Sequence, residues 1–329
     1  MIQTGSHPSP SGSGLETIAI APGVDLRVHT FAGGAGPTVL VMGGVHGDEL
    51  EGPLIAARVI RRLADADIEG TVQVIAIAHP PAFETGTRLG PDGGNLNRAF
   101  PGDARGSATE RIAHVLESRF FEGADLVIDL HTGGVAIFYL PMAVIPAEAW
   151  ENDREAYGTI LRQFGFPAFL YDSGDDAPSS VFAAGARAGC RVLSAELGGG
   201  AGVSHTTIER ATIGIVALLS GMGVVTVPVT DQAAHPLLVH RPRADQSTKA
   251  EFPGLFEPIV APGDWIERGD VIGLMHHADD PIASPRPIHA DSAGLVVCHR
   301  APARTAIGDI LFKIGTPVDT GGQHRSIAQ

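Results

Sequence analysis

The chain contains few cysteines and few basic side chains. The two cysteines, Cys190 and Cys298, lie far apart and show no metal-ligand spacing, so two reduced thiols in a cytosolic protein are the simplest interpretation. Lysine and arginine total 23 against 37 aspartates and glutamates, which gives a formal net charge of -14. Nucleic acids and anionic membranes bind clusters of basic side chains, so this balance argues against both as partners.

The sequence also has few long, uninterrupted apolar runs of the kind that signal peptides and membrane spans contain. Residues 1–14 are rich in Ser, Gly and Pro without a basic start or an apolar core, so we expect a flexible tail. Residues 211–230 carry no charge, but glycines and Pro228 interrupt this stretch, whereas a membrane helix needs about 20 apolar residues in a row. A buried helix over 206–219 fits better, and we expect a cytoplasmic protein.

Apolar side chains are abundant, at 44% of the residues, which is enough for a large core. Up to residue 235, short apolar runs alternate with stretches of helical periodicity, a pattern typical of an α/β sheet. We expect a hairpin of 17–21 and 25–30, strands at 39–42, 71–78, 124–130 and 191–195, and helices at 50–63, 107–120, 149–164, 179–188 and 206–219.

After Pro236 the helical periodicity stops. Short apolar runs separated by Gly, Asp and Pro turns follow, first over 258–273 and again over 290–297 and 307–311. This pattern predicts a small all-β domain. We therefore expect an α/β domain over 15–235, an all-β domain over 236–317 and a polar tail over 318–329.

Polar side chains follow three of the predicted strands. His46 and Glu49 lie in a Gly-rich turn after the strand 39–42, His131 follows the strand 124–130, and Glu196 follows the strand 191–195. In α/β sheets the ligand site lies at the carboxyl ends of the strands. We therefore expect these four side chains at one edge of the sheet.

Two histidines and a glutamate match the ligand set of catalytic zinc sites that keep a fourth position for water. Zinc bound in this way lowers the pKa of its water to about 7. A zinc hydrolase also needs a general base and a cation for the developing oxyanion. Glu196 can serve as the base, and Arg88 or Arg98, on the long irregular loop 83–102, as the cation.

Each of these residues also has a purely structural interpretation. A lone histidine at a strand end is usually a hydrogen-bonded structural residue, Glu49 could cap the following helix, and Arg98 could form a surface ion pair. Asp129, on the same strand face as His131, either orients a ligand imidazole or accepts backbone amides. Their conjunction in Gly-rich loops after apolar strands favours a site.

Four segments occur in the order and spacing of one known family. They are Gly44–Glu49 with the sequence GVHGDE, Asn95–Arg98 (NLNR), Asp129–His131 (DLH) and Glu196–Gly198 (ELG). From about residue 37 to 317 the chain resembles the succinylglutamate desuccinylase/aspartoacylase family, relatives of the zinc carboxypeptidases. The resemblance implies a zinc-carboxypeptidase-like mixed sheet flanked by helices, with a small C-terminal all-β domain that is biotinyl/lipoyl-like.

The resemblance also implies the roles of the site residues. One zinc ion per subunit would be bound by His46, Glu49 and His131. Glu196 would activate the water and protonate the leaving amine, and Arg88 would polarise the scissile carbonyl. Asn97 and Arg98 would hold the substrate carboxylate, to which a guanidinium fork can donate two hydrogen bonds.

Within the family, the chain looks closest to a bacterial branch that contains N-acetyl-diaminobutyrate deacetylases. Neither Arg187 nor Arg191 is in register with the arginine that reads a second substrate carboxylate in aspartoacylase, which argues against a dicarboxylic substrate. The acidic loop 172–176 would suit a cationic substrate side chain, although a solvated surface loop is the simpler interpretation.

The sequence thus predicts a zinc amidohydrolase that removes a short acyl group from a small N-acyl amino acid. A zinc carboxypeptidase acting on peptides would use the same metal ligands. A non-catalytic binding protein on the same scaffold would require loss of residues that this chain retains. The β domain carries no lysine in a carrier-like hairpin, since neither Lys249 nor Lys313 fits, so we expect a lid or an assembly surface in a homo-oligomer.

Overall fold

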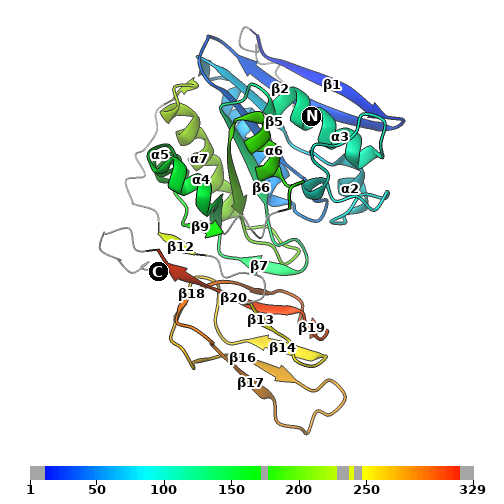
Figure 1. Cartoon of the computed structure of the whole chain (residues 1–329), viewed down its shortest axis with the longest axis vertical. Helices are drawn as coiled ribbons and strands as arrows, with labels where there is room; N and C mark the ends of the chain where they lie inside the picture. Colours follow the sequence, from blue (N-terminus) through cyan, green and yellow to red (C-terminus); the bar gives the residue numbers. More distant parts are fainter. Residues whose placement is uncertain (1–11, 172–176, 228–236, 241–246, 319–329) are drawn as a thin grey trace, which may run out of the picture.

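The structure is a computed structural model that describes residues 12–171, 177–227, 237–240 and 247–318. Helices cover both faces of a long mixed sheet, and a β region built from residues 248–317 lies at one end of the molecule (Figure 1). The predicted α/β class, with a mixed sheet and a C-terminal β region, is confirmed.

The first part of the chain contains the helices, most strands of the long sheet and a separate two-stranded sheet of β4 and β11. Its strands are β1 (Gly14–Ala21), β2 (Val24–Ala32), β3 (Thr38–Gly43), β4 (Asp67–Ile68), β5 (Thr71–Ile75), β6 (Leu126–His131), β7 (Ile137–Tyr139), β8 (Met142–Pro146), β9 (Ala168–Tyr171), β10 (Arg191–Glu196) and β11 (Val225–Thr226). Its helices are α1 (Glu51–Leu63), α2 (Pro80–Thr85), α3 (Ala108–Leu116), α4 (Ala147–Asn152), α5 (Arg154–Phe164), α6 (Val181–Ala188) and α7 (His205–Gly221), with a 3-10 turn at Leu96–Arg98 and a π-helical turn at Glu117–Phe121.

The remaining strands are β12, which pairs with β9 in the long sheet, and those of the C-terminal β region. They are β12 (Leu238–His240), β13 (Thr248–Lys249), β14 (Gly254–Pro258), β15 (Trp265–Ile266), β16 (Val271–His276), β17 (Arg286–His289), β18 (Gly294–Arg300), β19 (Arg304–Thr305) and β20 (Ile310–Pro317). Four of them, β14, β16, β17 and β19, form a separate antiparallel sheet.

Four neighbouring strands at the centre of the long sheet, in the order β5-β3-β6-β10, run parallel. Their carboxyl ends therefore meet at one edge, where His131 and Glu196 end β6 and β10. These two residues are direct register partners. Side chains of register partners point to the same face of a sheet, so the topology places an imidazole beside a carboxylate.

Alternation along β6 separates the core from the site. Leu126, Ile128 and Leu130 pack in the cluster that contains residues of α1, α5 and α7, whereas Val127 packs with α3 and α6 on the opposite face. Asp129 and His131 share the face of Val127 because side chains alternate along a strand. The polar strand end therefore lies on the α3 and α6 side of the sheet.

Some predicted elements have different limits in the structure. The helix predicted over 107–120 becomes α3 followed by a π-helical turn, in which the Glu122 amide donates to the Glu117 carbonyl. The helix predicted over 149–164 breaks at Asp153, whose side chain accepts from the Ala156 amide and caps α5. The strand predicted over 71–78 ends at Ile75.

The long sheet continues across the predicted domain boundary. β12 pairs in parallel with β9 and antiparallel with β20, and β7 pairs with β18. The boundary residues 235–236 and most of the predicted tails lie outside the described residues, while Gly14 already belongs to β1. Lys249 is exposed on β13 and Lys313 is buried on β20.

Residues 211–221 of the uncharged stretch form the second half of α7, which packs against α1 and α5. In the part of the chain that the structure describes, no helix has both the length and the apolar character that a membrane crossing requires. The buried helix predicted over 206–219 is confirmed.

Candidate metal centre

The Gly-rich turn after β3 brings His46 and Glu49 to the edge of the sheet. Gly44 adopts a positive φ of 64°, a conformation that glycine adopts at little cost. A Cβ at Gly47 would lie 1.8 Å from the Ala82 carbonyl oxygen, so only glycine allows this approach to α2. The glycines of the motif therefore shape the turn that carries the two polar side chains.

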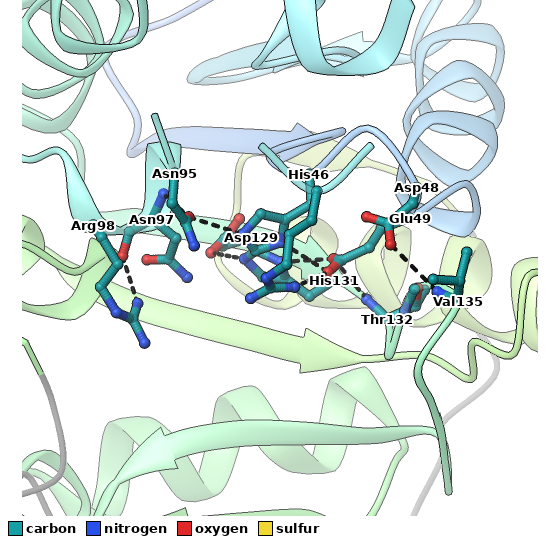
Figure 2. A network of polar contacts seen from close by, with 12 residues as sticks. His46, Asp48, Glu49, Asn95, Asn97, Arg98, Asp129, His131, Thr132 and Val135 are labelled. Carbon is teal, nitrogen blue, oxygen red and sulfur yellow. Dashed lines mark hydrogen bonds and ion pairs between the residues drawn. The ribbon is translucent and has the colours of Figure 1, made fainter. Parts of the chain in front are cut away.

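His46, Glu49 and His131 form one buried cluster in which each residue offers a ligand atom, all within 4.8 Å of one another. The Glu49 Oε1 atom lies 2.7 Å from His46 Nδ1, and Glu49 Oε2 lies 2.9 Å from His131 Nδ1. Figure 2 shows both imidazoles turned toward the Glu49 carboxylate. The structure thus brings together the three residues predicted as metal ligands.

The far nitrogen of each imidazole is also engaged. His131 Nε2 lies 2.7 Å from Asp129 Oδ2, and His46 Nε2 lies 3.1 Å from Asn95 Oδ1 (Figure 2). Both oxygens can accept a proton from Nε2, and that tautomer would leave the two Nδ1 atoms, which face Glu49, as the nitrogens able to bind a metal. Of the two interpretations of Asp129, the structure shows the contact with the imidazole.

The contact of Asn95 was not predicted. The residue lies in the NLNR segment, and its Oδ1 also accepts from the Asn97 amide at the start of the 3-10 turn. A local capping signal therefore marks Asn95 in the sequence, but its contact with His46 depends on the fold. The contact of Asp48 also depends on the fold. Its Oδ2 accepts from the Val135 amide and so connects the Gly-rich turn after β3, which we call the metal loop, to the loop after β6.

Burial and charge act in opposite directions on this cluster. Burial disfavours the charged form of His131, but the carboxylates of Asp129 and Glu49 outweigh it and hold the His131 pKa well above its usual value. Burial likewise disfavours the charged form of Glu49, but His131 and His46 hold the Glu49 pKa well below its usual range. The cluster therefore keeps a carboxylate ionised in a buried position.

The donor set fits a zinc ion. Two imidazole nitrogens and one carboxylate are the protein ligands of many catalytic zinc sites, and their far sides are usually held by carboxylates, carbonyls or water. Asp129 and Asn95 supply such contacts here and leave the Nδ1 atoms directed at Glu49. A cation at the center of the cluster would also be compatible with the lowered pKa of Glu49.

Glu196 reaches the same edge from β10. It is half-buried, and the backbone continues past it with a hydrogen bond of 2.9 Å from the Leu197 amide to the His131 carbonyl. Glu196 and His131 are register partners, so both project from the same face of the sheet. The predicted base is thus adjacent to a predicted metal ligand.

The three predicted substrate contacts are placed differently. Arg88 Nη1 donates to Glu49 Oε1 at 2.9 Å, and its side chain is 52% exposed. Asn97 Oδ1 accepts from the Val181 amide at the start of α6. Arg98 is exposed and donates to the Asn97 carbonyl (Figure 2). The loop therefore lies beside the cluster, with Arg88 in direct contact with it.

A second polar cluster, formed by His79, Asp92 and Thr109, holds the loop 83–102 against α3. The Thr109 hydroxyl donates to Asp92 Oδ1 at 2.8 Å and accepts from His79 Nε2 at 3.0 Å. The His79 amide donates to the Gly44 carbonyl, so the cluster links the metal loop to the start of α3. Burial lowers the pKa of His79, and hydrogen bonds from Thr109 outweigh burial to lower the pKa of Asp92 to about 2.

The comparison with known families agrees with this geometry. The family model described as the succinylglutamate desuccinylase/aspartoacylase catalytic domain matches residues 35–222. The chain belongs to the succinylglutamate desuccinylase/aspartoacylase family. The matched residues include the turn after β3, the NLNR segment and the ends of β6 and β10, so the resemblance drawn from four short segments is confirmed.

Individual relatives match this family member along most of its length. The N-alpha-acetyl-L-2,4-diaminobutyric acid deacetylase of Halomonas elongata is 32% identical over 292 residues, which cover 88% of this chain and 85% of that protein. The product-bound structure of the ectoine utilization protein EutE (DoeB) from Ruegeria pomeroyi has 28% identity and a TM-score of 0.81, covering 89% of each chain.

A further solved structure, described as succinylglutamatedesuccinylase/aspartoacylase from Rhodobacter sphaeroides, has 28% identity and a TM-score of 0.84, with 93% and 95% of the two chains covered. These matches extend well past residue 222, where the catalytic family model ends. The C-terminal β region is therefore part of the architecture that this chain shares with its relatives.

Proposed function

We propose that this family member is a zinc-dependent amidohydrolase that removes a short acyl group from an N-acyl amino acid. The observation that carries the proposal is the buried His46, Glu49 and His131 cluster, with Glu196 in register beside it. Metal-dependent deacylation of an amide uses a metal-activated water, a base to deprotonate it and an acid for the leaving amine. The chain supplies residues for all three at one edge of its sheet.

In this proposal the two histidines and Glu49 hold the metal. Zinc with three protein ligands lowers the pKa of a bound water to about 7 and polarises a carbonyl oxygen. Asp129 and Asn95 fix the tautomers of the two imidazoles by accepting their Nε2 protons.

Glu196 takes a proton from the attacking water and later delivers it to the leaving amine. This double role requires a carboxylate within hydrogen-bond reach of both atoms. The register of β6 and β10 supports it, because it holds the Glu196 backbone next to that of His131.

The arginines provide the contacts to the substrate. Arg88 lies within hydrogen-bond distance of Glu49, and its half-exposed side chain can turn to the scissile carbonyl. Arg98, exposed on the same loop, binds the substrate carboxylate together with the side-chain nitrogen of Asn97. The side-chain oxygen of Asn97 already accepts from the Val181 amide.

A cationic or neutral side chain on the substrate fits better than a second carboxylate. The relative from Halomonas elongata is named as acting on acetylated 2,4-diaminobutyric acid, which carries an amino group on its side chain. The two arginines closest in sequence to Glu196 are engaged, Arg187 by Glu117 and Arg191 by Asp153. The acidic loop considered as a contact for such a cation, residues 172–176, lies outside the described residues.

The test combines metal analysis with a hydrolysis screen. Purified protein is expected to contain about one zinc per chain, and His46→Ala is expected to contain much less. N-acetyl, N-formyl and N-succinyl amino acids and blocked dipeptides are then compared for release of free amine. We expect zinc-dependent hydrolysis of acylated amino acids; cleavage of the dipeptides alone would instead identify a carboxypeptidase, and a metal-bound protein without turnover would identify a binding protein.

A further inference from the structure

The segment after Glu196 depends on neighbouring strands for its shape. Three consecutive glycines, Gly198, Gly199 and Gly200, adopt positive φ angles of 107°, 128° and 68°. Glycine backbones lose more conformational entropy on folding than any others, so a run of them orders only where other groups hold it. Contacts that order these three glycines, which we call the glycine segment, therefore also hold the backbone next to Glu196.

The groups that hold it belong to residues 133–140, which we call the β7 strap. Four backbone hydrogen bonds join the two segments. The Gly133 and Tyr139 amides donate to the Gly198 carbonyl at 3.0 and 3.1 Å. In the other direction, the Gly200 amide donates to the Ile137 carbonyl at 3.1 Å and the Ala201 amide to the Gly134 carbonyl at 3.0 Å. A Cβ at Gly199 would lie 2.3 Å from the Ile137 carbonyl oxygen, so the contact is backbone against backbone.

The other edge of the β7 strap is paired with the C-terminal β region. Tyr139, Phe138 and Ile137 are register partners of Cys298, His299 and Arg300 on β18. Two further hydrogen bonds flank this pairing, from Leu140 to Val297 at 2.8 Å and from Ala301 to Ala136 at 2.9 Å. In Figure 1, β7 accordingly lies against the β region, away from the central strands.

Side chains reinforce this backbone connection. The Phe138 ring stacks on His299 with 5.9 Å between centroids and 28° between planes, and His299 meets the buried Phe312 edge-on at 6.4 Å. The Phe138 ring also approaches the glycines, because a Cβ at Gly200 would lie 3.5 Å from its Cδ2 atom. A row of aromatic rings thus runs from the core of the β region to the glycine segment.

We propose that the β7 strap positions Glu196, and that His299 is a positioning residue that acts through Phe138. This role rests on the proposed function as far as turnover is concerned. A base displaced by about 1 Å can lose roughly 100-fold in rate, so the proposal predicts a catalytic effect from a residue in the C-terminal β region. It also predicts a change in backbone protection that does not depend on turnover.

The experiment compares His299→Ala with wild type by amide hydrogen exchange and by kinetics. We expect peptides that cover 197–203 to exchange at least about tenfold faster in the variant, because the stack that orders their partner strand is lost. We expect kcat to fall about 10- to 100-fold with KM and zinc content near wild type. His299→Phe keeps an aromatic ring and is expected to restore both readouts.

Two further variants complete the design. His276→Ala is the matched control, since His276 is a half-buried histidine of the same region that lies on β16 and contacts Glu257 at 2.7 Å. It is expected to leave exchange over 197–203 unchanged. Phe138→Leu removes the ring from the other side of the stack and gives the same test if His299→Ala fails to fold.

The outcomes separate this proposal from the proposed function. Wild-type exchange over 197–203 in His299→Ala, or a His299→Phe variant as impaired as His299→Ala, would overturn the positioning role. A loss confined to KM would also overturn it, because a displaced base lowers kcat. If wild type hydrolyses no acylated amino acid, the proposed function fails, and the exchange data still decide whether the β7 strap holds the glycine segment.

Discussion

Glu196 and His131 are register partners at the carboxyl ends of two adjacent parallel strands. Their backbones are joined directly past the strand ends, where the Leu197 amide donates to the His131 carbonyl. The sheet therefore sets the separation of the proposed base from a proposed metal ligand. Sites built on regular elements are held more precisely than sites on loops, and here His46, Glu49 and Arg88 lie on loops.

Glu196→Gln is the most direct test of the mechanism. The amide can accept hydrogen bonds but cannot take up a proton, so we expect kcat to fall about 100- to 10,000-fold. Zinc content is expected to remain near one per chain, because Glu196 is not among the clustered ligand atoms. Glu69→Gln, at an exposed position, provides the control. Retained turnover in Glu196→Gln would remove this residue from the mechanism.

Asn95→Ala and Asp129→Ala test the partners of the two imidazoles. Loss of such partners typically weakens metal binding about 10- to 100-fold. We expect both variants to bind zinc more weakly in competition with a chelator, with Asp129→Ala the weaker of the two, because a carboxylate polarises an imidazole more than an amide does. Wild-type zinc affinity in both variants would show that the rings are oriented by other contacts.

Zinc affinity should depend strongly on pH. In the metal-free protein the His131 pKa is raised, so zinc must displace a proton from His131 even at pH values where an ordinary histidine, with a pKa of about 6.5, is neutral. We expect affinity to rise about tenfold per pH unit above that value, measured by chelator competition. Asp129→Asn lowers the His131 pKa and should flatten this slope near neutral pH.

The raised pKa of His131 also affects the stability of the metal-free fold, which should fall with rising pH whereas zinc affinity should rise. A pKa raised above its unfolded value adds stability below about pH 6.5, and this stability is lost as the pH rises through the folded pKa. Urea unfolding of the chelator-treated protein should therefore show stability that decreases above neutral pH. A flat profile would contradict the raised pKa of His131.

Local patterns in the sequence mark several of the candidate site residues. His46, Glu49, His131 and Glu196 each follow an apolar run that ends in glycines or a polar turn, and the parallel strands then bring them to one edge. The family resemblance rested on the same short segments. These features could be predicted because each depends on neighbouring residues and on one general property of α/β sheets.

Other features depend on contacts between distant segments. β7 is three residues long, and its partners are the glycine segment after Glu196 and β18, so no local periodicity identifies it. The contact of Asn95 with His46 and that of Arg88 with Glu49 arise in the same way. A sequence without an alignment contains no direct signal for such pairings.

The cluster of His79, Thr109 and Asp92 gives a prediction about stability. Thr109→Val removes a hydroxyl that donates to Asp92 and accepts from the fully buried His79. The variant leaves the His79 Nε2 proton without its acceptor, and a buried group left unsatisfied costs about 1–3 kcal/mol. We expect urea unfolding to report a loss of this size in the zinc-loaded protein.

The matched control for this prediction is Thr85→Val. The Thr85 hydroxyl is exposed at the end of α2 and donates to helix carbonyls that water can also satisfy, so we expect a change within about 0.5 kcal/mol. Because His79 also holds the Gly44 carbonyl, Thr109→Val should weaken zinc binding as well, whereas Thr85→Val should not. Equal losses in the two variants would show that the cluster stabilises neither the fold nor the metal loop.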